Sequence, residues 1–394
     1  MVAQRNHRQA RPERPQSSLG HLLNDDLFHL ATPWAEQLNA GLQESDTAGA
    51  FPLDKWKAIQ ESGILRTPFD PKLGGDGRSL PDTMRALEGL GYTSRDAGLS
   101  FSTSTQIVSV GIPMQRFGSP ELKNRYLPNI MAGDLITAHA ITEESGGSDA
   151  TNIATVAHRD GDDYVVNGSK MFITNAPIAD LFLLYVRTGK AGPFGLTTLL
   201  VEADTPGLTV GPVMDKIGLR TSPIGTLEFN ELRIPAAHRI GAHGAGFLVL
   251  DYVMKREVLF GFSLTLGEMT RRLEETVAFA KRRTQFGQPI GKFQAISHKL
   301  ADMKMRIETA RKWLTDTGAK VEAGQDAAFD LAATKTIVSE ANLQTALDAV
   351  QIHGGRGVLT EFGIERELRN SIAGTIYSGS SEIQRNRIAT LMGL

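Results

Sequence analysis

A single carboxylate interrupts an apolar stripe in the segment DYVMKREVLFGFSL, residues 251–264. Val253 lies one helical turn before Glu257 and continues the apolar stripe. Phe260 and Gly261 lie one turn after it, on the same face of the expected helix. A carboxylate in apolar surroundings is suited to act as a general base, and the small Gly261 leaves room beside it for a substrate. The alternative is a solvated surface glutamate paired with a neighbouring basic side chain.

A turn rich in hydroxyl groups and glycine, AITEESGGSDA at residues 140–150, is the second feature able to do chemistry. Its glycines allow the backbone to direct N–H groups toward an anion. The alternative is an ordinary hydroxyl-rich turn. The sequence lacks the motifs of three other chemistries. The nine histidines are scattered without metal-ligand spacing, the G-x-S-x-G elbow of serine hydrolases is absent, and so is the phosphate-binding P-loop. We therefore expect no metal site.

Three stretches of different character must position these residues. Residues 21–135 show apolar residues at helical spacing, residues 136–243 hold short β-rich runs, and helical periodicity returns over residues 244–394. This order differs from a doubly wound dinucleotide-binding fold, which alternates strand and helix. The three longest helices are expected over residues 247–283, 295–323 and 327–352.

Composition places the chain among globular proteins of more than one domain. It has 394 residues, a formal net charge of −2 and no cysteine. Disulfides, thiolate metal sites and a cysteine nucleophile are therefore excluded. The small net charge gives no reason to expect nucleic acid or an anionic membrane as a partner. No run of about 18 apolar residues is present, so no membrane span is expected, and a cytoplasmic location fits.

The first twenty residues differ from the rest. They contain four arginines and two prolines, with almost nothing apolar. A transit peptide is also rich in arginine, but Pro12 and Pro15 interrupt any amphipathic helix. We therefore expect residues 1–20 to form a disordered tail.

Beyond residue 20 the sequence resembles the acyl-CoA dehydrogenase family along nearly its whole length. The segment at 140–150 resembles the T-E-P-x-A-G-S-D motif of the family. The other matching motifs, in family order, are NGSKMFITNA (167–176), RRTQFGQPIGKFQAISHKLADM (282–303), QIHGGRG (351–357) and IYSGSSEIQRNRIA (376–389). The resemblance implies an α+β multidomain fold with a helical N-terminal domain, a central β-barrel-like domain and a C-terminal four-helix bundle. It also implies FAD as cofactor.

The resemblance further implies which residues bind FAD. Ile141 and Thr142 would contact the isoalloxazine ring, and Ser148 the pyrophosphate. Phe172 would lie against the ring, where the family usually has Trp, and Thr174 would reach flavin N5. Other residues assigned to the cofactor by their motif positions are His139, Gly147, Gln294, Ser380 and Glu382.

A second cofactor surface is expected to act on a neighbouring subunit. In the family, the arginine of R-x-Q-F-G and the glutamine of Q-x-x-G-G reach across to the FAD of another chain. The residues in question are Arg283, Phe286, Gln351, Gly354 and Gly355. A homodimer or homotetramer is therefore expected. The reduced cofactor would pass its electrons to an electron-transfer flavoprotein or to oxygen.

The base departs from the commonest family pattern. Many members carry it as Tyr-Glu-Gly-Thr, whereas this chain reads Tyr-Ser-Gly-Ser at 377–380. Ser378 cannot take this role without an activating partner. Isovaleryl-type and long-chain members place the glutamate on the first long C-terminal helix, and that position falls on Glu257. We therefore expect Glu257 to remove the α-proton while the β-hydride leaves for flavin N5. The alternative is a flavin-binding scaffold that has lost its base.

One subgroup, the prolyl-carrier-protein dehydrogenases of natural-product biosynthesis, is especially similar. It resembles this chain over residues 95–106, 112–127 and 173–182, and it shares the Ser-Gly of the C-terminal motif. We therefore expect a thioester-bound acyl or aminoacyl group tethered to a carrier protein. A free acyl-CoA is the alternative substrate, and a flavin-dependent oxidase or monooxygenase on the same fold is the alternative reaction.

Overall fold

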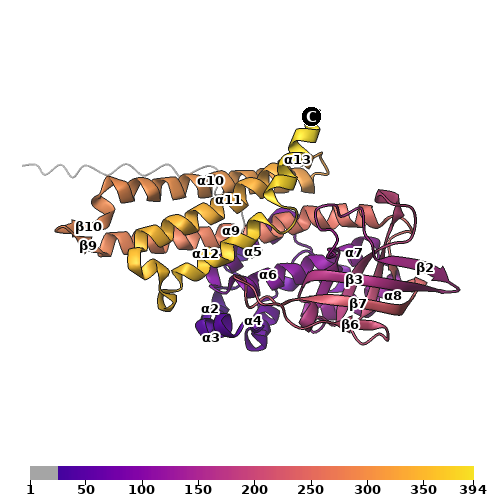
Figure 1. Ribbon diagram of the computed structural model, residues 1–394. Helices are drawn as coiled ribbons and strands as arrows, with labels where there is room; N and C mark the ends of the chain where they lie inside the picture. Colours follow the sequence, from indigo (N-terminus) through magenta and orange to yellow (C-terminus); the bar gives the residue numbers. More distant parts are fainter. Residues whose placement is uncertain (1–24) are drawn as a thin grey trace, which may run out of the picture.

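The N-terminal third of the protein is helical. A computed structural model describes residues 25–394, so the tail expected over residues 1–20 lies outside the described part (Figure 1). Ser79 and Ser119 cap two of the helices, because each side chain accepts a hydrogen bond from a backbone N–H in the first turn. The helices are α1 (Asp25–Phe28), α2 (Ala35–Asn39), α3 (Leu42–Ala48), α4 (Leu53–Ser62), α5 (Leu80–Thr93), α6 (Ala97–Gln106), α7 (Ile112–Phe117) and α8 (Pro120–Ala132).

A twisted sheet forms the middle of the chain. Its strands are β1 (Thr137–Ala140), β2 (Val156–Asp160), β3 (Asp163–Thr174), β4 (Leu181–Arg187), β5 (Leu196–Glu202), β6 (Leu208–Val210), β7 (Ile224–Pro235) and β8 (Arg239–Ile240). The eight-stranded sheet has the order β6-β7-β3-β2-β4-β5-β8, with β1 parallel to β4. The strands enclose a hydrophobic core of their own, built around Phe182 and Leu184. The sheet is not a closed barrel, because β6 and β8 do not pair within residues 25–394.

Long helices return in the C-terminal part. They are α9 (Gly246–Arg282), α10 (Gln294–Glu322) and α11 (Ala328–His353), followed by α12 (Ile364–Ile372) and α13 (Ser381–Leu391). The hairpin of β9 (Thr284–Gln285) and β10 (Gln288–Pro289) connects α9 to α10. The three predicted long helices agree with these bounds to within one residue. Figure 1 confirms the predicted order of helical, β and helical parts. The predicted division at residues 135/136 and 243/244 stays a prediction.

Helix α9 carries Glu257 and packs closely against α5. A Cβ added at Gly91 of α5 would lie 2.0 Å from the carbonyl oxygen of Leu264, and one at Gly267 would lie 2.0 Å from that of Glu88. Any side chain at these two glycines would therefore push the helices apart. Because the backbones of α5 and α9 are in close contact on this side, α9 is held in place and positions the residues on its other faces.

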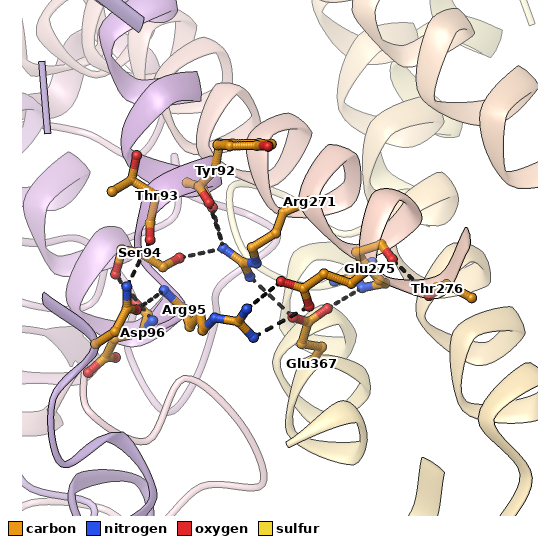
Figure 2. A network of polar contacts seen from close by, with 12 residues as sticks. Tyr92, Thr93, Ser94, Arg95, Asp96, Arg271, Glu275, Thr276 and Glu367 are labelled. Carbon is orange, nitrogen blue, oxygen red and sulfur yellow. Dashed lines mark hydrogen bonds and ion pairs between the residues drawn. The ribbon is translucent and has the colours of Figure 1, made fainter. Parts of the chain in front are cut away.

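A network of charged groups fixes α9 to α12 and to the junction of α5 and α6 (Figure 2). Arg271 donates hydrogen bonds to the carbonyl oxygens of Gly91 and Ser94 and to Glu367. Arg272, the next residue on α9, donates to the second carboxylate oxygen of Glu367 at 2.6 Å. Burial opposes ionisation of Glu367, but the two guanidinium groups lower its pKa to about 2. The helix that bears Glu257 is thereby anchored about four turns after that residue.

Candidate active site

The carboxyl group of Glu257 lies between two polar side chains from distant parts of the chain. Its side chain is 18% exposed, with Nε2 of His139 lying 3.3 Å from Oε2. On the other side, Ser378 Oγ donates a hydrogen bond to Oε1 at 2.5 Å. The residue is therefore not a solvated surface glutamate. It stands where the C-terminal motif, strand β1 and helix α9 meet.

The backbone before α13 brings Ser378 to this position. Ser378 and Gly379 have φ angles of +56° and +83°, so two consecutive residues are left-handed. A left-handed conformation is uncommon outside glycine and concentrates at functional sites. The preceding ring of Tyr377 packs on Phe101, with centroids 4.7 Å apart, and on Phe262. This packing fixes the turn that aims the Ser378 hydroxyl at α9.

Several polar atoms around Glu257 lack a partner. Nδ1 of His139, Oε2 of Glu257 and the hydroxyl of Tyr185 are buried without a hydrogen bond to any residue from 25 to 394. Buried polar atoms nearly always have partners, and leaving one unpaired costs about 1–3 kcal/mol. Burial and the charge of Glu257 raise the pKa of Tyr185, so its hydroxyl keeps its proton. These unpaired polar atoms indicate a ligand-binding site, in which polar atoms of the ligand would supply the missing hydrogen bonds.

A small cavity begins one helical turn from Glu257. A Cβ added at Gly261 would meet no atom within 4 Å, so the expected space beside the carboxylate is present. The cavity measures about 20 Å³, and its walls include Phe101, Gly261, Leu264, Thr265, Glu268 and Tyr377. The buried carboxyl of Glu268 lines this cavity and has no hydrogen-bond or ion-pair partner among the described residues. Burial raises the pKa of Glu268 to about 7, although Arg271 and Arg272 oppose the rise.

We expect replacement of Glu268 by Gln to stabilise the protein at neutral pH. The folded-state pKa of about 7 lies above the ordinary value of 4.5, so protonated Glu268 favours folding below pH 4.5, and this contribution is lost as the pH rises through 7. The free energy of unfolding of Glu268→Gln should exceed that of the parent by up to about 3 kcal/mol above pH 7. The difference should vanish near pH 4.5. Guanidinium unfolding at several pH values measures it, with the exposed Glu36→Gln as control, and a pH-independent difference would contradict it.

A buried ion pair anchors the hydroxyl-rich turn at residues 140–150. Lys170 Nζ lies 2.8 Å from Glu143 Oε1 and donates a second hydrogen bond to the carbonyl oxygen of Ile141. Glu143 also accepts from the backbone N–H groups of Ala154 and Thr155. Burial alone would raise the pKa of Glu143, but Lys170 and the hydrogen bonds from Thr155 hold this pKa below its ordinary range. The turn therefore has a defined shape before any ligand binds.

An aromatic surface adjoins this turn. The pairing of β3 with β7 shifts register between Lys170 and Ile173, and Phe172 in this bulge has a φ angle of +59°. Its ring is 54% exposed, although a phenyl ring is normally buried. A strained residue that exposes an aromatic face fits a flat ring system, and hydroxyl donors next to it fit the polar edge of a flavin. This surface supports the predicted flavin site.

The residues predicted for this surface lie in one region of the chain. Ile141, Thr142 and Thr174 are partly exposed, and Gly147 and Ser148 are exposed. His139 precedes them on β1, but its side chain turns to Glu257. The structure therefore gives His139 a place beside the predicted base in addition to its predicted place in the cofactor segment.

The second predicted cofactor surface forms a groove at the far end of α9. The groove measures about 390 Å³, and its walls include Arg283, Phe286, His353, Gly354 and Gly355. Phe286 is 93% exposed. A Cβ on either glycine would meet no atom within 4 Å, so the space in front of the backbone is open. Gln351 is exposed on the last turn of α11, next to this groove. The groove thus joins a permanently charged guanidinium, an aromatic ring and open backbone.

The remaining predicted residues lie at helix starts. Ser380 caps α13 and accepts a hydrogen bond from the N–H of Ile383. Glu382 lies in the first turn of the same helix, and Gln294 is the first residue of α10. Both side chains are exposed. Within residues 25–394 no cluster of His, Asp or Glu could hold a metal ion, and no helix has the length and apolar character to cross a bilayer.

Models of one known protein family match all three parts of this architecture. The N-terminal, middle and C-terminal domain models of acyl-CoA dehydrogenases match residues 31–134, 138–232 and 244–393. The chain is 41% identical to the L-prolyl-peptidyl-carrier-protein dehydrogenase of Serratia sp. over 371 residues, or 94% of this chain and 96% of that protein. It belongs to the acyl-CoA dehydrogenase family. The predicted family, fold class and oxidoreductase activity are thereby confirmed.

Two solved structures of this family are similar over nearly the whole chain. The prolyl acyl carrier protein oxidase AnaB has a TM-score of 0.91 and 38% identity, covering 94% of this chain and 100% of its own. PigA with FAD and proline also has a TM-score of 0.91, with 39% identity, covering 94% and 97% of the two chains. A likeness of this extent includes all three parts of the fold.

Sequence analysis of this dehydrogenase missed three roles. It treated Ser378 only as a vacant base position and did not connect it to Glu257. It assigned His139 to the cofactor alone, and it did not select Glu268. The spacing of residues 257, 261, 264 and 268 on one helix face was a signal that could have found Glu268.

We expect Ser378→Ala to slow the chemical step without preventing it. The serine hydroxyl is the only described hydrogen-bond donor to Glu257, and it fixes the rotation of the carboxylate. A charge-assisted bond of this kind contributes about 1.5–3 kcal/mol, and a misplaced base reacts more slowly. The rate of flavin reduction at saturating substrate should fall about tenfold, with little change in KM. A KM effect alone would contradict this role, and Ser378→Thr, which keeps the hydroxyl, serves as control.

Proposed function

We propose that this protein oxidises a prolyl group, held as a thioester on a carrier protein, at its α- and β-carbons. The observation that carries the proposal is the largely buried carboxylate of Glu257, which accepts a hydrogen bond from Ser378 and lies 3.3 Å from His139 of the predicted cofactor segment. The relatives support the substrate class, since their names specify a prolyl group on a carrier protein. A cytoplasmic location, expected from the sequence, is part of the proposal.

FAD is the cofactor, in agreement with the FAD-containing PigA structure. When bound, FAD supplies at N5 the acceptor for the hydride that leaves the β-carbon. The residues proposed to hold it fit the chemistry required. The exposed ring of Phe172 would lie against a flat ring system, Thr142 and Thr174 would offer hydroxyl groups, and Ser148 lies in the anchored turn that would bind phosphate.

Glu257 performs the proton transfer. Its Oε2 atom has no hydrogen-bond partner within the described residues, so a lone pair is free to accept a proton from the α-carbon. Ser378 holds the other oxygen and keeps the carboxylate in one rotation. Phe101 and Tyr377 line the small cavity that begins one helical turn away. The proton therefore moves to Oε2 while the adjacent β C–H bond breaks with its electron pair.

A dinucleotide shared between two copies of the chain is also proposed. Glu257 and Arg283 lie on α9 and its C-cap, 26 residues apart. At about 1.5 Å per residue they are separated by roughly 39 Å, farther than one FAD molecule extends. The groove at Arg283 and the flavin surface at Phe172 thus serve two different cofactors. A homodimer or homotetramer provides both, and the electron acceptor is a flavoprotein or oxygen.

Anaerobic titration of the FAD-loaded protein tests the proposal. Prolyl-carrier protein, straight-chain acyl-carrier proteins and prolyl-CoA are added in turn, and the flavin absorbance is recorded. Bleaching by prolyl-carrier protein, faster than by prolyl-CoA, is expected. Bleaching by a free CoA thioester alone would favour an acyl-CoA dehydrogenase. A hydroxylated product in the presence of oxygen would favour the monooxygenase alternative.

A further inference from the structure

Two polar atoms at the base lie close together without forming a hydrogen bond. Nε2 of His139 and Oε2 of Glu257 lie 3.3 Å apart, yet Oε2 is buried and without a hydrogen-bond partner among residues 25–394. The side chains are 14% and 18% exposed, so water offers little compensation. An unpaired arrangement of this kind is costly unless a ligand completes it.

The backbone gives His139 little freedom to move away. It lies on β1, which pairs in parallel with β4 and places His139 opposite Leu183. The neighbouring strand residues Ala138 and Ala140 are fully buried. The imidazole therefore projects from a fixed strand toward α9. Its position is set by the sheet and not by Glu257 alone.

The chemistry of the α-carbon determines which ligand atom comes to this place. A base must approach the carbon that loses its proton to about 3–3.5 Å. In an aminoacyl group the nitrogen is bonded to that same carbon. When Oε2 of Glu257 faces the α C–H bond, the nitrogen can therefore come within hydrogen-bond reach of Nε2 of His139, which lies 3.3 Å from Oε2.

We propose that His139 recognises the α-amino nitrogen of the substrate through its Nε2 atom and so makes this site selective for aminoacyl over plain acyl thioesters. The inference rests on the proposed function and deepens it. The N–H group of the prolyl ring donates to Nε2 of the imidazole, and Oε2 of Glu257 remains free for the α-proton. No covalent step involves His139, which acts as a specificity-determining residue.

The test uses two substrates that differ at one atom. Prolyl and cyclopentanecarbonyl groups have the same ring size, but the second carries CH2 in place of N–H. Both are loaded on the same carrier protein, and flavin reduction in the holoenzyme is followed anaerobically. A site built to bind an N–H group rejects the analogue that lacks it, so the parent should reduce its flavin roughly 100-fold faster or more with the prolyl thioester.

His139→Leu should reduce this preference to within about tenfold, mainly by slowing the prolyl reaction. His139→Gln keeps a hydrogen-bonding group and should retain part of the preference. Equal slowing of both substrates by His139→Leu would overturn the inference, because it indicates a purely structural role. Equal rates of the parent with both substrates would overturn it as well. Failure of the parent with every thioester would instead refute the proposed function, and the inference with it.

A binding measurement provides a readout that does not depend on turnover. Pantetheine amides of proline and of cyclopentanecarboxylic acid are titrated into the protein in a calorimeter. The parent should bind the prolyl amide at least about tenfold more tightly, and His139→Leu should bind both alike. An unchanged ratio of dissociation constants in the variant would overturn the inference. A far-UV circular dichroism spectrum and a thermal unfolding midpoint equal to the parent's confirm that the variant has folded.

Discussion

Glu257→Gln is expected to reduce its flavin with thioester substrate at least about 1,000-fold more slowly than the parent. Glutamine has the shape of glutamate and can still accept the hydrogen bond from Ser378, but it cannot take up a proton. Cofactor content and thioester binding should remain near those of the parent, since no described cofactor-surface residue contacts Glu257 except His139. Anaerobic stopped-flow absorbance measures the rate, and a rate near that of the parent would remove Glu257 as the base.

A position exchange provides the matched control. The hydrogen bond between Ser378 and Glu257 shows that both positions face the same point in space. The double variant Glu257→Ser with Ser378→Glu moves the carboxylate to the other end of this bond and should recover activity to within about 100-fold of the parent. The single variant Glu257→Ser should remain as slow as Glu257→Gln. Recovery only in the double variant would assign the lost rate to the carboxylate and not to damage of the site.

The long helices and the order of the three parts could be predicted because their signals are local. Helical periodicity located α9, α10 and α11 to within one residue, and glycine and proline marked the β-rich runs. Motif order indicated the flavin turn and the groove at Arg283. Local patterns were sufficient for the helices and the turn because each is formed by residues close together in the sequence, whereas the groove joins residues 279–296 to residues 352–355 and was indicated only by the family motifs.

The contacts that define the base could not be predicted in this way. Ser378 and Glu257 are 121 residues apart, and His139 reaches Glu257 from another part of the fold. Their pairing depends on the left-handed turn at Ser378 and on how the sheet packs against α9, neither of which leaves a periodic signal. The open edge of the sheet could not be predicted for the same reason. Alternation of polar and apolar residues predicts strands, but whether the outer strands β6 and β8 pair depends on twist and strand number.

The largest stability effect is expected at Glu367, remote from the predicted chemistry. Its carboxylate is 16% exposed and pairs with both Arg271 and Arg272 of α9, as Figure 2 shows for Arg271. Removing one partner of a buried ion pair leaves the remaining charge uncompensated, at a cost of about 3–5 kcal/mol. Glu367→Gln should therefore lower the free energy of unfolding by about this amount. Guanidinium unfolding at pH 7 measures the change, with the exposed Glu361→Gln as control.

The pH dependence separates this ion pair from simple packing. Because the pKa of Glu367 is lowered to about 2, its contribution is present above the ordinary glutamate pKa of 4.5 and is lost as the pH falls toward 2. The difference between parent and Glu367→Gln should accordingly shrink below pH 4.5. The triple variant Arg271→Met, Arg272→Leu and Glu367→Leu removes all three charges. It should be less destabilised than Glu367→Gln, since none of the three charges is left buried without its partner. If the triple variant were the less stable of the two, hydrogen bonds from Arg271 to the carbonyl oxygens of Gly91 and Ser94 would outweigh the charge pairing in holding α9.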